Sequence, residues 1–300
     1  MSDYVQQNFS ITSFHTLENW VICEGFDDKI KSKIEKFGKR LGDWKLNIYR
    51  GILTGYNDAF IIDQKTKDCL ISQNPNCVDF IRPILRGRDI KRYTYENSHQ
   101  FLIAFPCGFT NSISKHESAT NWLHSSHPEI ENVLLDHSNS NSSKSKGLMN
   151  RDDQGDYWWE LRHCAYWNVF NGQVIAWQRI THENQFVLTQ KGDVVLDSMA
   201  FISGAGKYAY YFLALLNSPL MLYWMKKTVP QYGNTGFRLS NQFVSIFPAK
   251  EITENELTKI DLLVKDYLKS SNEKELFEIN AMIYKFYNLT DDEIVRIIGS

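Results

Sequence analysis

The chain has 300 residues, of which 43% are hydrophobic and 23% charged. This composition is typical of compact folded domains and excludes a largely disordered, collagen-like or coiled-coil protein. No apolar run reaches the roughly 18 residues of a membrane-spanning helix. Residues 1–10 lack the basic and apolar regions of a secretory signal. We therefore expect a cytoplasmic protein with no membrane contact.

The net charge of −2 is distributed unevenly. Residues 251–300 contain eleven acidic and six basic side chains. This tail therefore has a net charge of −5, and the first 250 residues have a net charge of +3. Because acidic side chains repel anions, an anionic partner is expected to contact the first 250 residues and not the tail.

The first elements are predicted from the spacing of apolar residues. A helical spacing predicts a helix over 27–41, with Asp27 or Asp28 as its cap. Residues 46–53 and 59–63 have strand patterns. The Gly- and Asn-containing turn between them predicts a hairpin.

The middle of the chain alternates strand patterns with short helical ones, and a Ser/Asn/Lys stretch over 137–147 predicts a loop. The expected helices lie near 117–124, 128–136 and 207–216, and the expected extended segments are 101–105, 174–180, 186–189, 200–203 and 237–247.

The last fifty residues contain two amphipathic helical patterns, and Thr290 with Glu293 forms a capping box for a short final helix. We therefore expect an α+β fold with a mixed β-sheet and peripheral helices. The expected domains are a large one over 1–250, with a helical lead-in over 1–45, and a small acidic helical subdomain over 251–300.

Motifs of known catalytic sites are missing from the sequence. Gly204-Ala-Gly206-Lys207 lacks the spacing of a phosphate-binding loop, and no nucleophile elbow, zinc-protease helix or dinucleotide-binding motif is present. The five cysteines form no C-x-x-C pair, and the histidines between 116 and 137 are interrupted by Pro128. We expect no catalytic residue and no metal site. An active site assembled from distant segments stays open as an alternative.

A basic cluster indicates an anionic ligand. The segment RPILRGRDIKR, residues 82–92, holds five bases and one acid. Such a cluster is typical of contact with nucleic-acid phosphates, and the alternative is an exposed strand and turn with salt bridges. The candidate residues, which flank Gly87, are Arg86, Arg88, Lys91 and Arg92.

Aromatic and amide side chains add to this pattern. Tyr157, Trp158 and Trp159 lie close to Arg162, and rings interleaved with arginine can stack on bases, although they can equally fill a core. The turn-rich segment 229–240 carries amide and guanidinium groups that can read base edges, and the alternative is an ordinary surface loop. The candidate DNA-binding residues of these regions are Trp158, Arg162, Arg179, Gln231, Asn234 and Arg238.

Several segments together resemble a known family. They are GILTGYNDAFIID (51–63), RPILRGRDIKRY (82–93), YWWELR (157–162), VIAWQRI (174–180), LLNSPLMLYW (215–224) and INAMIYKFYNLTDDEI (279–294). From about Trp44 to its end, the chain is similar to the TaqI-like C-terminal specificity domain. That domain is the recognition half of adenine-N6 DNA methyltransferases and of type IIG restriction–modification enzymes. Gln173 stands where family members often have Lys, and the 137–147 loop is particular to this chain.

The resemblance implies a target recognition domain that holds double-stranded DNA against a separate catalytic methyltransferase domain. The S-adenosylmethionine loop and the Asn-Pro-Pro-Tyr/Phe motif of that catalytic domain are absent here, and Asn74-Pro75-Asn76-Cys77 is the nearest string. We therefore expect no cofactor in this chain and S-adenosylmethionine in the catalytic domain. The module would position duplex DNA so that the partner can flip and methylate adenine. The alternative functions are an autonomous enzyme and a protein-interaction or scaffold domain.

Overall fold

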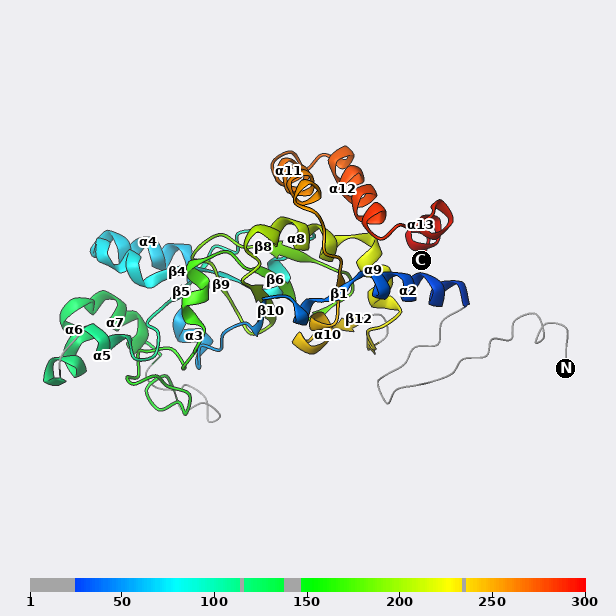
Figure 1. The fold of residues 1–300 in the computed structure, drawn as a ribbon. Helices are drawn as coiled ribbons and strands as arrows, with labels where there is room; N and C mark the ends of the chain where they lie inside the picture. Colours follow the sequence, from blue (N-terminus) through cyan, green and yellow to red (C-terminus); the bar gives the residue numbers. More distant parts are fainter. Residues whose placement is uncertain (1–24, 114–115, 138–146, 234–235) are drawn as a thin grey trace.

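A computed structural model describes residues 25–113, 116–137, 147–233 and 236–300 (Figure 1). A four-stranded antiparallel sheet lies at its centre, in the order β2, β10, β6, β8. Its strands are β2 (Asn47–Arg50), β10 (Met199–Ser203), β6 (Ile175–Gln178) and β8 (Phe186–Leu188).

This central sheet separates two hydrophobic cores. Along β10, Ala200 and Ile202 face one core, whereas Met199 and Phe201 face the other. Successive side chains of a strand point to opposite faces, so a strand that is buried on both faces is apolar throughout. β10 is therefore buried at every position.

The core on the side of Met199 and Phe201 is covered by a second sheet and by helices of the N-terminal half. This sheet has the order β3, β5, β4, β9, in which only β4 and β9 are parallel among the described strands. The strands are β3 (Ile61–Asp63), β5 (Gln100–Ile103), β4 (Ile81–Leu85) and β9 (Val194–Val195). The helices of this half are α3 (Asn57–Phe60), α4 (Gln64–Gln73), α5 (Phe109–Ile113), α6 (Trp122–Ser126) and α7 (Pro128–Leu135).

The core on the side of Ala200 and Ile202 is covered by helices from both ends of the chain, and α11 and α12 pack on α8 (Figure 1). Buried apolar residues of α11 and α12 join the core of the central sheet, and capping boxes start α11 and α13. The α+β fold is confirmed. The division at residue 250 stays a prediction. The helices are α2 (Gly25–Phe37), α8 (Ala209–Asn217), α9 (Pro219–Lys226), α10 (Asn241–Ser245), α11 (Glu254–Ser270), α12 (Glu273–Phe286) and α13 (Asp291–Ile298).

Two small sheets complete the fold. A three-stranded sheet has the order β11, β12, β7, and β1 pairs with β13. The strands are β11 (Gln231–Tyr232), β12 (Gly236–Arg238), β7 (Ile180–Thr181), β1 (Lys39–Arg40) and β13 (Pro248–Ala249). No helix within the described ranges combines the length and the hydrophobicity that crossing a bilayer requires.

The hairpin predicted over 46–63 is wrong. β2 belongs to the central sheet and β3 to the second sheet, and α3 lies between them. The two strands do not pair with each other because the backbone at Gly51 passes close to the backbone of Leu196. A side chain on Gly51 would place its Cβ 2.0 Å from the carbonyl oxygen of Leu196. The Gly-rich motif is therefore a crossing between sheets, and Gly55, with a φ of +86°, turns the chain there.

Two other predicted boundaries also differ. The first helix ends at Phe37, four residues before Leu41, and Asp27 lies buried within it instead of capping it. The segment 237–247, expected to be extended, contains α10.

Candidate nucleic-acid interface

A polar cleft of about 610 Å³ opens where the two larger sheets meet. Its walls come from the start of α3, the 3₁₀ helix η3 (Gly87–Asp89), the end of β6 and the turn before β10. The polar residues that line it are Asn57, Asp58, Arg86, Arg88, Gln100, Gln178, Asp197 and Ser198. The cleft thus combines two guanidinium groups and two carboxylates with amides and a hydroxyl.

Three arginines gather beside this cleft. Arg50 ends β2 and forms an ion pair with Asp197 at 3.1 Å. Arg179 follows β6 and donates to the carbonyl oxygen of Asp197 at 3.4 Å. Arg238 lies exposed on β12, where it pairs with Ile180 next to Arg179.

The electrostatics of this arginine cluster favour an added anion. Burial lowers the pKa of Arg179, and the positive charges of Arg50 and Arg238 lower it further. Asp197 supplies one negative charge against three positive ones. An anion placed among the arginines would relieve this repulsion. We call Arg50, Arg179 and Arg238 the arginine cluster.

The surface continues from the arginine cluster to Arg162. A hollow of about 180 Å³ is lined by both Arg50 and Arg162, and a neighbouring one of about 200 Å³ extends from Arg162 to Trp167. Arg162 pairs with Asp153 at 3.1 Å, and both side chains are partly exposed. The predicted residues Arg162, Arg179 and Arg238 thus border one surface, although their segments are far apart in sequence.

The basic segment 82–92 divides into different roles. Arg88 is exposed on the cleft wall and has no ion-pair partner among the described residues. Arg86 binds both carboxylate oxygens of Asp89, at 3.0 and 3.1 Å, and also donates to Gln100. Arg86 therefore fixes the turn that presents Arg88.

The other two bases of this segment are engaged elsewhere. Lys91 forms an exposed ion pair with Glu96. Arg92 is half-buried and donates through Nε to the carbonyl oxygen of Asn217 at 2.8 Å, at the end of α8. The structure does not bring Arg92 to the cleft, because its side chain packs beside Tyr93 under the C-terminal helices.

The aromatic segment 157–159 is mainly part of the core. Trp159 is 3% exposed and stacks on Tyr157 with ring centroids 4.7 Å apart. Trp158 is half-buried and meets Trp159 edge-on at 5.5 Å. The alternative of rings that fill a core therefore applies to Trp159, while Trp158 keeps part of its surface exposed.

The segment 229–240, expected to be a loop, contains the β11–β12 ribbon. Gln231 and Tyr232 are exposed on β11, and Tyr232 keeps 50% of its surface exposed. Arg238 is exposed on the neighbouring strand. Asn234 lies outside the described residues.

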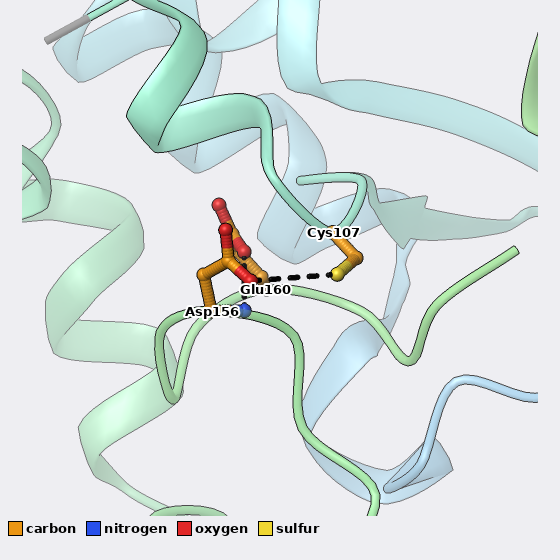
Figure 2. A group of neighbouring side chains, drawn as sticks. All are labelled: Cys107, Asp156 and Glu160. Carbon is orange, nitrogen blue, oxygen red and sulfur yellow. Dashed lines mark hydrogen bonds between the residues drawn. The ribbon is translucent and has the colours of Figure 1, made fainter.

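One group of metal-ligand side chains converges away from the cleft. Figure 2 shows Cys107, Asp156 and Glu160, whose ligand atoms lie within 4.8 Å of one another. The buried Glu160 carboxylate accepts backbone N–H bonds from Gly108 at 3.0 Å, Thr110 at 2.9 Å and Asp156 at 2.8 Å. Burial raises the pKa of the Cys107 thiol. These contacts indicate a structural carboxylate that anchors the start of α5.

Sequence reasoning missed Arg50, Gln178 and Ser198. Arg50 is an isolated base in a strand, and Gln178 is an ordinary end of a strand, so neither has a local signal. They join the site because β2, β6 and β10 are neighbours in the central sheet. Arg50 of the arginine cluster would be found only from that strand order.

The comparisons with known proteins agree with this fold. The model of the TaqI-like C-terminal specificity domain matches residues 82–249, which is more than half of the chain. The chain belongs to this family of specificity domains, which confirms the resemblance seen in its sequence. A comparison with curated proteins found no match.

Two solved restriction–modification enzymes are similar to the chain in fold. One is the type IIL enzyme MmeI in complex with DNA, with a TM-score of 0.54 and 12% identity over 87% of this chain. The other is the type IIG restriction endonuclease BpuSI, with a TM-score of 0.50 and 13% identity over 87% of this chain. The chain spans 35% of MmeI and 33% of BpuSI, about a third of each enzyme.

Proposed function

We propose that this chain is the DNA target recognition module of an adenine-specific restriction–modification enzyme. The single observation that carries the proposal is the arginine cluster beside the polar cleft, in a chain that belongs to the specificity-domain family. Excess positive charge attracts the phosphates of duplex DNA, and amides and hydroxyls in the adjoining cleft can meet base edges.

The proposed contacts divide into two kinds. Arg88 and the arginine cluster bind phosphates, because they are cationic and at least partly exposed around the cleft. Gln231 and the exposed part of β12 contact the DNA from the β11–β12 ribbon. Arg162 extends the contact beyond Arg50 along the hollow that both residues line. In this arrangement Arg86 is a support for Arg88, and Arg92 belongs to the packing of the C-terminal helices.

Catalysis belongs to a separate domain in this proposal. That domain, in the same polypeptide or in another subunit, binds S-adenosylmethionine, flips the adenine and methylates N6. The module itself transfers no methyl group and acts in the cytoplasm. A nuclease domain is not part of the proposal.

The test is a selection from a library of randomised duplexes with the purified 300-residue chain at low salt. We expect one short sequence to be enriched, and we expect binding of that sequence to weaken steeply as salt rises. Recovery of no preferred sequence, or binding that does not respond to salt, would contradict the proposal. A parallel assay with tritiated S-adenosylmethionine should show no transfer to the selected duplex.

A further inference from the structure

Gln178 has an unusual position for a polar side chain. It is the last residue of β6, where it pairs with Met199 of β10, and its side chain lines the cleft. The amide has no hydrogen-bond partner among the described residues, whereas the nearby Gln100 is held by Arg86. Gln178 is half-buried. Its unpartnered amide therefore lies in the lining of the cleft, at the end of a β-strand.

The side chain of Gln178 packs against Gly87. A Cβ on Gly87 would lie 2.8 Å from Cγ of Gln178 and 3.1 Å from its Cδ. The side chain therefore lies directly against the backbone of Gly87, in space that only glycine leaves open. The Gly87 backbone is itself fixed, because its N–H donates to Oγ of Ser198 at 3.3 Å and the ion pair of Arg86 with Asp89 closes the turn.

The hydrogen-bonding groups of this amide match adenine best among the four bases. A glutamine amide offers one acceptor and donors, and adenine presents an acceptor at N7 and a donor at N6 in the major groove. The cations next to it, Arg88 and the arginine cluster, would hold the adjoining phosphates and set the register.

We infer that Gln178 is a specificity-determining residue that reads adenine at one base pair, and that Gly87 positions its amide for this contact. The inference rests on the proposed function, because it assigns a base contact within the proposed DNA interface. It separates Gln178 from Arg88, which lines the same cleft but carries a charge suited to phosphate.

The experiment repeats the library selection with four variants and measures competition between duplexes that differ at one pair. Gln178→Ala should lose the preference for A·T at one position, by about 5- to 150-fold, and keep the preferences elsewhere. Gln178→Glu should shift that position toward cytosine, whose N4 amino group donates to a carboxylate. Gly87→Ala should reproduce the loss, because its methyl group displaces the amide.

Gln173→Ala is the matched control, since Gln173 lies just before β6 and donates to the carbonyl oxygen of Thr189 outside the cleft. It should retain every preference, and melting curves should show all four variants folded. An unchanged base preference in Gln178→Ala, or an equal loss for all duplexes, would overturn the inference while the proposed function stands. If Gln178→Ala lost the A·T preference but Gly87→Ala kept it, the positioning role of Gly87 would be overturned. If the unmodified chain selects no sequence, the proposed function itself fails.

Discussion

Asp27 is a buried carboxylate that ties both ends of the chain together. It is 1% exposed and accepts hydrogen bonds from Arg296 at 2.8 Å, Lys227 at 2.6 Å and Tyr223 at 2.8 Å. Tyr223 lies on α9, Lys227 directly follows that helix and Arg296 lies on α13, whereas Asp27 lies on α2. The hydrogen bonds of Arg296 hold the pKa of this carboxyl well below its usual range, against the opposing effect of burial.

We therefore expect Asp27→Asn to destabilise the fold. The cost should be about 2–3 kcal/mol, less than the roughly 3–5 kcal/mol of a fully buried broken pair because Arg296 and Lys227 are partly exposed. Urea unfolding curves measure it. The neighbouring Asp28→Asn is the control and should change the midpoint little, and equal shifts for the two variants would refute the assigned role.

The pH dependence of this ion pair has a defined sign. A carboxyl whose pKa is depressed by folding contributes stability that is fully present above its unfolded pKa of about 3.9. That contribution is lost as the pH falls from there toward the folded pKa. We expect the difference in unfolding free energy between the unmodified chain and Asp27→Asn to shrink below about pH 4. A difference that stays constant from pH 7 to pH 3 would show that the charge of Asp27 is not its source.

Charge counting could predict a basic segment that borders the cleft, but not the role of each base within it. Arg86, Arg88 and Arg92 lie within seven residues of one another, yet only Arg88 is exposed without an ion-pair partner among the described residues. The partner of Arg92 is Asn217, 125 residues away. Such contacts depend on tertiary packing, and no local pattern contains them.

Gly51 lets the chain pass from the central sheet to the second one. Its N–H donates to the carbonyl oxygen of Met199 at 3.0 Å, and the following Ile52 bonds Val195 at 2.8 Å. The backbone of Leu196 lies where a side chain of residue 51 would project. Neither backbone can move without breaking these hydrogen bonds.

Gly51→Ala should therefore destabilise the fold by about 3 kcal/mol, the upper end for overpacking of a core. Thermal unfolding followed by circular dichroism measures this loss. Gly172→Ala is the control, because a Cβ there would meet its nearest atom at an ordinary 3.6 Å. Similar melting temperatures for both variants would mean that the crossing adapts to a side chain.

At the scale of elements, periodicity predicted what depends on one segment. The amphipathic C-terminal helices and the capping box at Thr290 are found as expected, because helical faces and caps are local properties. The hairpin over 46–63 failed because its two strands pair with β10 and β5, which are remote in sequence. The turn residues were identified correctly, but a turn does not determine which strands pair.

At the scale of the whole molecule, the arginine cluster and the C-terminal helices α11 and α12 lie on different sides of the central sheet. In Figure 1, the helices α11 and α12, which carry seven acidic and five basic side chains, lie on one side of the central sheet, and α3, α10 and β12 lie on the other. The arginine cluster belongs to the second side through Arg238 of β12. A chain with a net charge of −2 can therefore still have a local excess of positive charge, here at the arginine cluster.

The last prediction uses this separation. Replacing Arg50, Arg179 and Arg238 together with Gln should weaken binding of the isolated chain to every duplex alike. If all three contact phosphate, the slope of log affinity against log salt should flatten by about 2–3, because each lost contact contributes roughly 0.9. Fluorescence anisotropy with a labelled duplex over a series of salt concentrations measures both quantities.

The matched control removes the same amount of positive charge from α11 and α12. Lys259, Lys269 and Lys274 are exposed on α11 and α12, and their replacement with Gln gives the same net charge as the arginine variant. If DNA lies across the arginine cluster, this control keeps its salt slope, since charges farther than a Debye length of about 10 Å at 0.1 M salt are screened. Equal slopes for the two variants would mean that net charge alone drives association and that the cluster is not the phosphate site.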